Sequence, residues 1–143
     1  MKWTVREGRP GDMVRVKVNS QMDHYGVFVS DSEIIQFGKN PSLRLGVNES
    51  EVFVCATDIN EFRDGGYPEF ADLSFSEKMK RFKTDKIIEN ARNRIGEGGY
   101  NILYNNCEHF AYECIFGKKY SSQSESAKEI IKQMATGQYK GEN

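Results

Sequence analysis

The chain has 143 residues, of which 38% are hydrophobic and 29% charged, and its 20 basic side chains nearly balance its 21 acidic ones. This length and composition are those of one globular domain with a single substantial core, and they exclude a disordered segment. Because the two signs of charge are interspersed, no broad basic face is expected, and we expect no nucleic-acid partner.

The first residues, MKWTVREGRPGDM, carry charges and a proline where a secretory signal peptide needs an apolar stretch. No run approaches the roughly 18 to 20 consecutive apolar residues of a membrane-spanning helix. Three cysteines at irregular spacing do not suggest a disulfide framework and fit a reducing compartment. We therefore expect a soluble, cytoplasmic protein whose contact with membranes is at most peripheral.

Four short strands are predicted in the first part of the chain. In the first of them, valines alternate with basic residues at the period of a half-buried strand. The others are rich in β-branched and aromatic residues and are separated by turn-prone segments. The four segments are residues 11–18, 24–31, 33–38 and 51–57. Their short links predict an antiparallel meander.

After a loop at residues 58–75 the apolar period changes to that of helices. Isoleucines and an alanine at helical spacing predict a helix that Thr84 is placed to cap. Gly96 is placed to end it in a left-handed conformation. A shorter helix is expected around residues 76–82.

The whole chain, residues 1–143, is therefore predicted to be a single α+β domain in which an antiparallel meander sheet packs against helices. Its core is expected to cover about residues 10–118. A last amphipathic helix is predicted at about 126–136, where Ser126 and Glu129 have capping-box spacing.

The segment YNNCEHFAYEC, residues 104–114, holds two of the three cysteines and one of the two histidines. Asn105 or Asn106 is placed to cap a helix that stops at Gly117. Four of its residues form a stripe at the spacing i, i+3, i+4, i+7, namely Cys107, Phe110, Ala111 and Cys114. The stripe predicts that this helix is buried.

A zinc site made of Cys107, His109 and Cys114 is disfavoured, because residues 107 and 109 point to nearly opposite sides of a helix. We therefore expect no metal and no other cofactor. Core packing fits Cys114, inside the stripe, and Cys55, in an alternating strand. Cys107 differs, because it falls in the first helical turn, where free N–H groups and the helix dipole stabilise a thiolate.

A thiolate nucleophile also needs a base, and the chain offers only His24 and His109. His109 is two residues along the same helix as Cys107 and faces away from it. His24 is on a predicted strand far away in sequence, as in cysteine–histidine pairs that meet only in the folded protein. From spacing alone, a structural role for His24 stays open beside the catalytic one.

Three segments resemble the lecithin:retinol acyltransferase-like family, whose members resemble papain-type cell-wall peptidases with the histidine placed before the cysteine. The segments are GDMVRVKV, DHYGVFVSDSEIIQFG and RIGEGGYNILYNNCEHFAYEC, and they cover most of residues 10–118. The sequence Asn-Cys-Glu-His-Phe at 106–110 is a highly specific signature. Within it, Phe110 is expected in the core, and Glu108 and His109 in structural hydrogen bonds. The resemblance implies a permuted papain-like fold with the nucleophile at a helix N-terminus.

Carried over residue by residue, the resemblance implies that Cys107 is the nucleophile and His24 the general base. The family's third polar residue lies twelve positions after that histidine and is Gln36 here, where many members have a second histidine. Its amide oxygen is expected to accept a hydrogen bond from the imidazole Nδ1–H and fix the ring, although a plain surface role stays open. Asn106 would cap the helix that carries the thiol, and Tyr25 would line the site or pack in the sheet.

These roles imply two-step acyl transfer, in which a cysteine attacks an ester or amide carbonyl and the thioester passes its acyl group to an acceptor. The resemblance points to a phospholipid or other lipid ester as donor, with water, an amine or an alcohol as acceptor. A cysteine peptidase or amidase, isopeptidase-like, stays open as an alternative. A non-catalytic binding module on the same fold also stays open.

The loop at residues 58–75 is expected to discriminate between a lipid and a peptide substrate. It contains four aromatic residues, which are Phe62, Tyr67, Phe70 and Phe75. An open apolar groove formed by them would favour an acyl chain, and a narrow polar cleft would favour a peptide.

Overall fold

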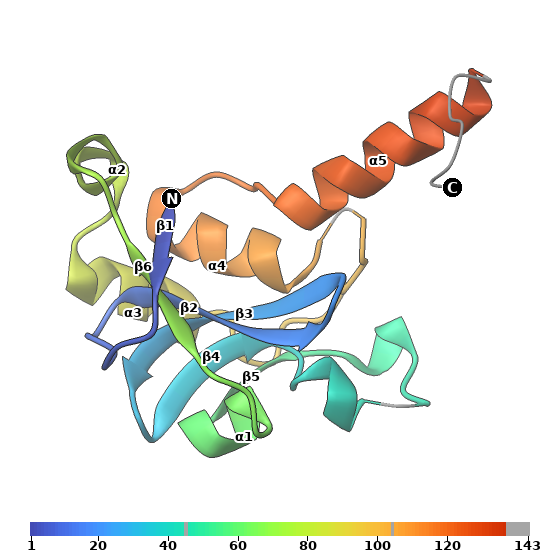
Figure 1. Cartoon of the computed structure of the whole chain (residues 1–143). Coiled ribbons are helices and arrows are strands. Elements are labelled where there is room, and N and C mark those ends of the chain that lie inside the picture. Colours follow the sequence, from blue (N-terminus) through green and yellow to red (C-terminus); the bar gives the residue numbers. More distant parts are fainter. Residues whose placement is uncertain (45, 104, 137–143) are drawn as a thin grey trace.

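One antiparallel sheet forms the centre of the protein (Figure 1), whose computed structural model describes residues 1–44, 46–103 and 105–136. Within these residues the sheet has six strands in the order β1-β6-β2-β3-β4-β5. The strands are β1 Lys2–Thr4, β2 Asp12–Asn19, β3 Met22–Ser30, β4 Glu33–Phe37, β5 Val54–Thr57 and β6 Glu69–Asp72. The predicted antiparallel meander is confirmed, and it consists of β2 to β5.

The two strands β1 and β6 are not predicted from the sequence. β6 lies in the segment that was expected to be a loop, and it pairs with both β1 and β2, so that Phe70 is opposite Thr4 and Val14. The two strands have three and four residues, too few for an alternating pattern to reveal them. Together they extend the sheet beyond β2 and join the N-terminal segment to the middle of the chain.

The fourth predicted strand is shorter than expected. β5 begins at Val54 instead of residue 51, because Glu49–Glu51 form a 3-10 turn, η2. A second such turn, η1, covers Pro41–Leu43 after the N-cap Asn40. Both turns belong to the long connection between β4 and β5.

The described residues also form five α-helices, which are α1 Ile59–Arg63, α2 Phe75–Lys80, α3 Thr84–Arg92, α4 Cys107–Phe116 and α5 Ser122–Ala135. α4 is confirmed as predicted, from its N-cap Asn106 to Gly117, which ends it with a φ of 76°. α1 was missed, since it has five residues, less than two helical turns. The chain is therefore an α+β protein, as predicted.

Two of the expected helix ends are corrected by the structure. α2 begins one residue before the expected start, because Ser74 and Glu77 form a capping box. α3 begins at Thr84, with Lys83 rather than Thr84 as N-cap, and it ends at Arg92. Gly96 has the expected positive φ of 92°, but it lies in a turn after the helix rather than at its end.

α5 begins four residues before the expected start. Ser121 caps it by accepting a hydrogen bond from the Ser124 backbone N–H, so the expected capping box at Ser126 and Glu129 is wrong. Figure 1 shows α5 extending away from the sheet. Across the described part of the chain, no helix combines the length and the apolar character needed to cross a bilayer.

Apolar side chains are buried on both faces of the sheet. α3 and α4 cover the face where Val27, Ile35 and Phe110 pack together. Phe62 of α1 closes a smaller cluster on the other face, which contains Val14, Val16, Phe28, Ile34 and Phe70. Figure 1 shows α4 and α1 on these two sides. Because side chains alternate along a strand, odd-numbered residues of β3 and β4 face α4 and even-numbered ones face α1.

Candidate active site

The signature segment places Cys107 as the first residue of α4. The side-chain oxygen of Asn106 accepts hydrogen bonds from the backbone N–H groups of Glu108 and His109, both at 3.0 Å. In return, His109 Nδ1 accepts the backbone N–H of Asn106 at 3.0 Å. This is a capping box in which histidine replaces the usual glutamate. His109 therefore has the structural role that was predicted for it.

Buried polar side chains tie the first turns of α4 and α5 together. The amide nitrogen of Asn106 donates to the Ile102 carbonyl at 2.9 Å and to Ser121 Oγ at 3.1 Å. Ser121 Oγ in turn donates to the Glu108 carboxylate at 2.9 Å, which Ser122 also reaches. These bonds satisfy groups that would otherwise be buried without partners, and they hold the start of α4 in one position.

The thiol of Cys107 is buried, with 4% of the residue exposed. Burial raises the pKa of this thiol to about 11, while a hydrogen bond from the Tyr25 backbone N–H and the positive charge of Arg44 act to lower it. The thiol is therefore protonated at neutral pH in the resting site. Its ionisation depends on a base or on bound substrate.

The sheet brings His24 and Gln36 together, although they lie twelve residues apart on β3 and β4. His24 Nε2 and Gln36 Oε1 are 2.8 Å apart, and both residues are fully buried. The Gln36 amide nitrogen donates to Thr57 Oγ1 at 2.6 Å and faces the Ile34 carbonyl at 3.4 Å. Thr57 Oγ1 donates in turn to the Asp58 carbonyl at 3.1 Å.

This chain of hydrogen bonds fixes which imidazole nitrogen carries the proton. The Asp58 carbonyl oxygen only accepts, so Thr57 gives it the hydroxyl proton and itself accepts from the Gln36 NH₂, which also faces the Ile34 carbonyl. The Gln36 oxygen therefore points towards His24. That oxygen also only accepts, and Nε2 therefore holds the proton. Nδ1 is the basic nitrogen, and this buried atom has no hydrogen-bond partner among the described residues. The expectation that Gln36 would bond Nδ1 is wrong, and the bond to Nε2 leaves Nδ1 free.

The imidazole is neutral at rest. Burial lowers the pKa of His24 to about 4, against the opposing effect of the Gln36 hydrogen bond, and the charge of Arg44 adds to the lowering. A neutral imidazole with a free Nδ1 is in the right state to accept a proton.

Cys107 and His24 approach the sheet from opposite faces. Tyr25 belongs to the cluster that contains Cys107, whereas the His24 ring lies against Phe62 on the other face, with 5.0 Å between the ring centroids. The β3–β4 ladder begins only at Val27, so the stretch of β3 that holds His24 is paired with β2 alone. The Tyr25 N–H that bonds the sulfur lies on this stretch. The sulfur is therefore beside the backbone that follows His24, at an edge where β3 and β4 are not joined.

A cavity of about 240 Å³ opens at Cys107. Its walls are formed by Gln21, the start of β3, Pro41 and residues 100, 102, 103, 106 and 107. Most of the other lining side chains are apolar or aromatic, and they include Met22, Tyr100, Ile102 and Leu103. Such a wall suits an apolar substrate group.

The aromatic residues of the segment 58–75 do not line this cavity. Phe62 and Phe70 are buried in the core, whereas Tyr67 and Phe75 are 80% and 81% exposed. The expectation that these residues form the substrate groove is therefore wrong.

Sequence patterns did not single out Arg44 and Thr57, although both act on the site. The Arg44 guanidinium lies over the Tyr100 ring at 5.1 Å, and its Nε is buried without a hydrogen-bond partner within the described part of the chain. Arg44 follows an irregular turn, where no periodic signal exists. Thr57 is opposite Ile34 in the β4–β5 ladder, so the strand register would have placed it on the same face as Gln36.

The remaining residues of interest pack as the sequence predicts. The Tyr25 side chain is buried in the core, edge-on to Trp3 with 5.9 Å between ring centroids. Cys114 is 1% exposed, and burial raises the pKa of its thiol to about 12. Cys55 is half-buried, and all three cysteines are free. Among the residues that the structure describes, no group of three or more histidine, cysteine or acidic side chains is placed to hold a metal.

The fold and the site define an α+β protein with a buried cysteine at a helix start and a hydrogen-bonded histidine at the adjoining strand. The chain belongs to the lecithin retinol acyltransferase family, whose model matches residues 6–120. It is 25% identical over 140 residues to the lecithin retinol acyltransferase of Homo sapiens, a match that covers 85% of this chain and 60% of the relative. It is also 26% identical over 131 residues to phospholipase A and acyltransferase 4 of Homo sapiens, with 86% and 79% covered. The chain thus spans about three fifths of the length of the lecithin retinol acyltransferases that it matches.

Proposed function

We propose that the protein is a thiol-dependent acyltransferase or acyl hydrolase that forms a thioester on Cys107 and takes its acyl group from a lipid ester. The observation that carries this proposal is the position of Cys107, at the first residue of α4, beside the stretch of β3 that holds His24 and at the wall of an apolar cavity. Membership of the family supports acyl chemistry, and the names of the relatives denote acyltransferase and phospholipase activity in those proteins. The fold is then a permuted papain-like one, with the nucleophile at a helix N-terminus.

In the first half-reaction, His24 Nδ1 takes the proton of the Cys107 thiol while the sulfur forms a bond to the ester carbonyl carbon. Both groups are neutral at rest, since the pKa of the thiol is about 11 and that of the imidazole about 4. The proton transfer therefore accompanies the attack instead of preceding it. The proposal requires the two side chains to meet across the edge where β3 and β4 are not joined, because the resting structure holds them on opposite faces of the sheet.

The carbonyl oxygen becomes an oxyanion in this step and needs hydrogen-bond donors. The backbone N–H of Cys107 and the Tyr25 N–H, which both bond the sulfur at rest, supply them, since the Asn106 side chain occupies the next two N–H groups of α4. The positive charge of Arg44 stabilises the negative charge that develops on the sulfur and the oxygen.

The ester C–O bond then breaks, and the leaving alkoxide takes the proton from the imidazolium of His24. A thioester on Cys107 and a free hydroxyl product, such as a lysophospholipid, result. In the second half-reaction, water, an amine or an alcohol gives its proton to Nδ1 and attacks the thioester. The C–S bond then breaks, and the imidazolium of His24 gives its proton to the leaving thiolate. The products are a fatty acid, an amide or an ester, and the free Cys107 thiol.

Gln36 and Thr57 act as positioning residues for this base. Gln36 holds the proton of His24 on Nε2, and Thr57 holds the Gln36 amide in the orientation that makes this possible. A neutral amide stabilises an imidazolium less than a carboxylate does, which agrees with an imidazole that is charged only during the reaction.

The cavity favours an acyl chain over a peptide as the donor group. A peptide carries an N–H and a C=O at nearly every residue, and a wall made largely of apolar side chains leaves these groups without partners. An acyl chain has no polar groups that would lose hydrogen bonds at such a wall, and the burial of its apolar surface lowers the free energy of binding.

A product assay with phospholipid vesicles and, separately, with a peptide panel tests the proposal. The wild-type protein is expected to release fatty acid or lysophospholipid, and Cys107→Ser and His24→Gln are expected to release none above background. Cys55→Ser is the matched control, because Cys55 is on β5 and outside the cavity, and it should keep full activity. Peptide cleavage without lipid turnover would replace this proposal by a peptidase. Lipid binding without turnover in the presence of water, amines and alcohols would replace it by a binding module.

A further inference from the structure

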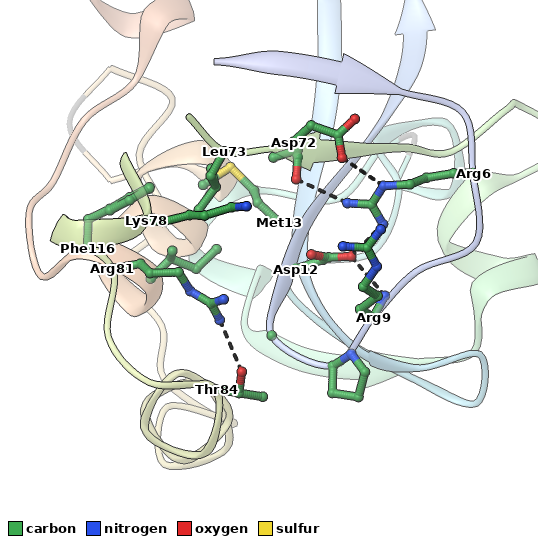
Figure 2. A pocket seen from close by; sticks show the side chains of 14 residues that line it. Arg6, Arg9, Asp12, Met13, Asp72, Leu73, Lys78, Arg81, Thr84 and Phe116 are labelled. Carbon is green, nitrogen blue, oxygen red and sulfur yellow. Dashed lines mark hydrogen bonds and ion pairs between the residues drawn. The ribbon is translucent and has the colours of Figure 1, made fainter. Parts of the chain in front are cut away.

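A second cavity, of about 230 Å³, lies at the opposite end of α4 from Cys107 (Figure 2). Its walls come from the N-terminal segment, the starts of β2 and α3, β6, α2 and the last turn of α4. Segments from both halves of the chain therefore meet there. The proposed acyl-transfer reaction does not use any of its lining residues.

Positive charge exceeds negative charge in this cavity. Its ionic side chains are four cations and two carboxylates, namely Arg6, Arg9, Lys78, Arg81, Asp12 and Asp72. Arg6 binds both carboxylates, at 2.8 Å from Asp12 and 2.9 Å from Asp72. The other three cations form no ion pair with the described residues. In a protein whose formal net charge is −1, the cavity keeps two positive charges in excess.

Two of the cations, Lys78 and Arg81, extend into the cavity and have N–H groups available for a bound anion. Figure 2 shows Lys78 and Arg81 reaching from one side towards Asp12 and the two N-terminal arginines on the other. Arg81 Nη2 donates to Thr84 Oγ1 at 3.3 Å, but its Nε is buried and has no hydrogen-bond partner within the described residues. A buried donor without an acceptor costs free energy, which a bound anion would recover.

The start of α3 adds favourable N–H groups. Thr84 lines the cavity as the first residue of this helix, and the side chain of the N-cap Lys83 makes no capping hydrogen bond. The cap thus leaves the first N–H groups without a side-chain partner. Asp85 places one negative charge in this first turn, but such N–H groups and the positive end of the helix dipole are typical binders of phosphate groups. The absence of a side chain at Gly11 lets the backbone pass close to Arg81, because a Cβ at this position would lie 3.0 Å from Arg81 Nη2. Gly11 also has a φ of +88°, which favours glycine.

We infer that this cavity binds a phosphate-type oxyanion, held by Arg81, Lys78 and the start of α3, with Arg9 at its rim. A dianion matches the excess of two positive charges. Four oxygens also match donors that come from separate directions better than the two oxygens of a carboxylate. The ligand is either free phosphate or the phosphate of an anionic lipid head group. The inference stands independently of the proposed acyl transfer.

Titration of the full chain with inorganic phosphate, followed by the backbone amide signals of Gly11 and Thr84, tests the site. The wild-type protein is expected to show saturable shifts that chloride at the same ionic strength does not produce. Arg81→Gln and Lys78→Gln should each weaken binding about tenfold, because each loses a charge-assisted hydrogen bond. Lys132→Gln, which removes an equal charge from exposed α5, is the control and should bind as the wild type does. Equal shifts with phosphate and chloride, or binding that both cavity variants leave unchanged, would overturn the inference.

Vesicles separate the two sources of the oxyanion. The first set contains phosphatidylcholine alone, and the second contains phosphatidic acid in addition. Binding to the second set only, weakened by Lys78→Gln and not by Lys132→Gln, identifies a lipid head group. Saturable phosphate binding without vesicle binding identifies free phosphate. If Arg81→Gln does not fold, the phosphate and vesicle binding of Lys78→Gln still tests the inference, because Lys78 is exposed and its replacement should not disturb the fold.

Discussion

Acid should destabilise the fold through His24, and the size of the effect follows from its burial. The pKa of this imidazole falls from 6.5 to about 4 in the folded protein because the ring is fully buried. Below pH 6.5 the unfolded chain therefore binds a proton that the folded protein does not bind until about pH 4. The free energy of unfolding falls as the pH is lowered through this window, and above it His24 has no effect. The full loss is roughly 3 kcal/mol, of which about 2 kcal/mol falls between pH 7.5 and 5.

Urea unfolding of the wild type and of His24→Gln at pH 7.5 and pH 5 measures this contribution. The variant should lose about 2 kcal/mol less than the wild type between the two pH values. Hydrogen bonds from Arg92 and Arg94 lower the pKa of the Glu33 and Glu97 carboxyls, and these groups are present in both proteins and cancel in the comparison. His109, whose pKa burial also lowers, is present in both proteins and cancels in the comparison. If both proteins lose the same free energy, His24 is not a buried neutral imidazole and the account of the base is wrong.

Three further variants test the surroundings of the site. Thr57→Val leaves the Gln36 amide nitrogen without its 2.6 Å partner, so the free energy of unfolding in urea should fall by about 1–3 kcal/mol and the rate of lipid turnover should also fall. Thr57→Ser keeps the hydroxyl and should restore the stability and the rate. Equal behaviour of the two variants would contradict the positioning role. Arg44→Gln removes a charge that lowers the pKa of His24, so NMR titration of the imidazole should give a higher pKa, and an unchanged value would mean that Arg44 does not act on it. Asn106→Ala removes two hydrogen bonds at the start of α4 and should lower the free energy of unfolding by about 1–2 kcal/mol, and a loss near zero would show that other residues hold the helix start.

The parts of the fold that the sequence predicted have local causes. α4 can be predicted because its cap, its apolar stripe and its terminal Gly117 all lie within one short segment. The meander can be predicted because apolar and polar residues alternate in its strands and most of the links between them are short. β1 and β6 cannot be predicted in this way. Their backbone pairs, such as Lys2 with Asp72, join segments that are far apart in sequence and show no alternation of apolar and polar residues. The start of α5 was misread because Ser126 has a capping-box spacing that Ser121 overrides through its place in the buried network beside Glu108.

The same distinction applies to the site. The residues that the family signature and its spacing identify, His24 and Gln36, do form a buried hydrogen bond. The choice of imidazole nitrogen depends on Thr57, which belongs to a third strand, and only the folded sheet shows it. Arg44 acts on the site from an irregular turn, and the contact depends on tertiary packing against Tyr100.

The mass of the intact protein, after brief incubation with phospholipid and an acid quench, shows whether Cys107 carries the acyl group. We expect a mass increase of one acyl chain that maps to Cys107 and is absent in Cys107→Ser. Neutral hydroxylamine should remove this acyl group, as it removes a thioester. Turnover that persists in Cys107→Ser, or an acyl group on Cys55 or another residue in the wild type, would contradict this expectation.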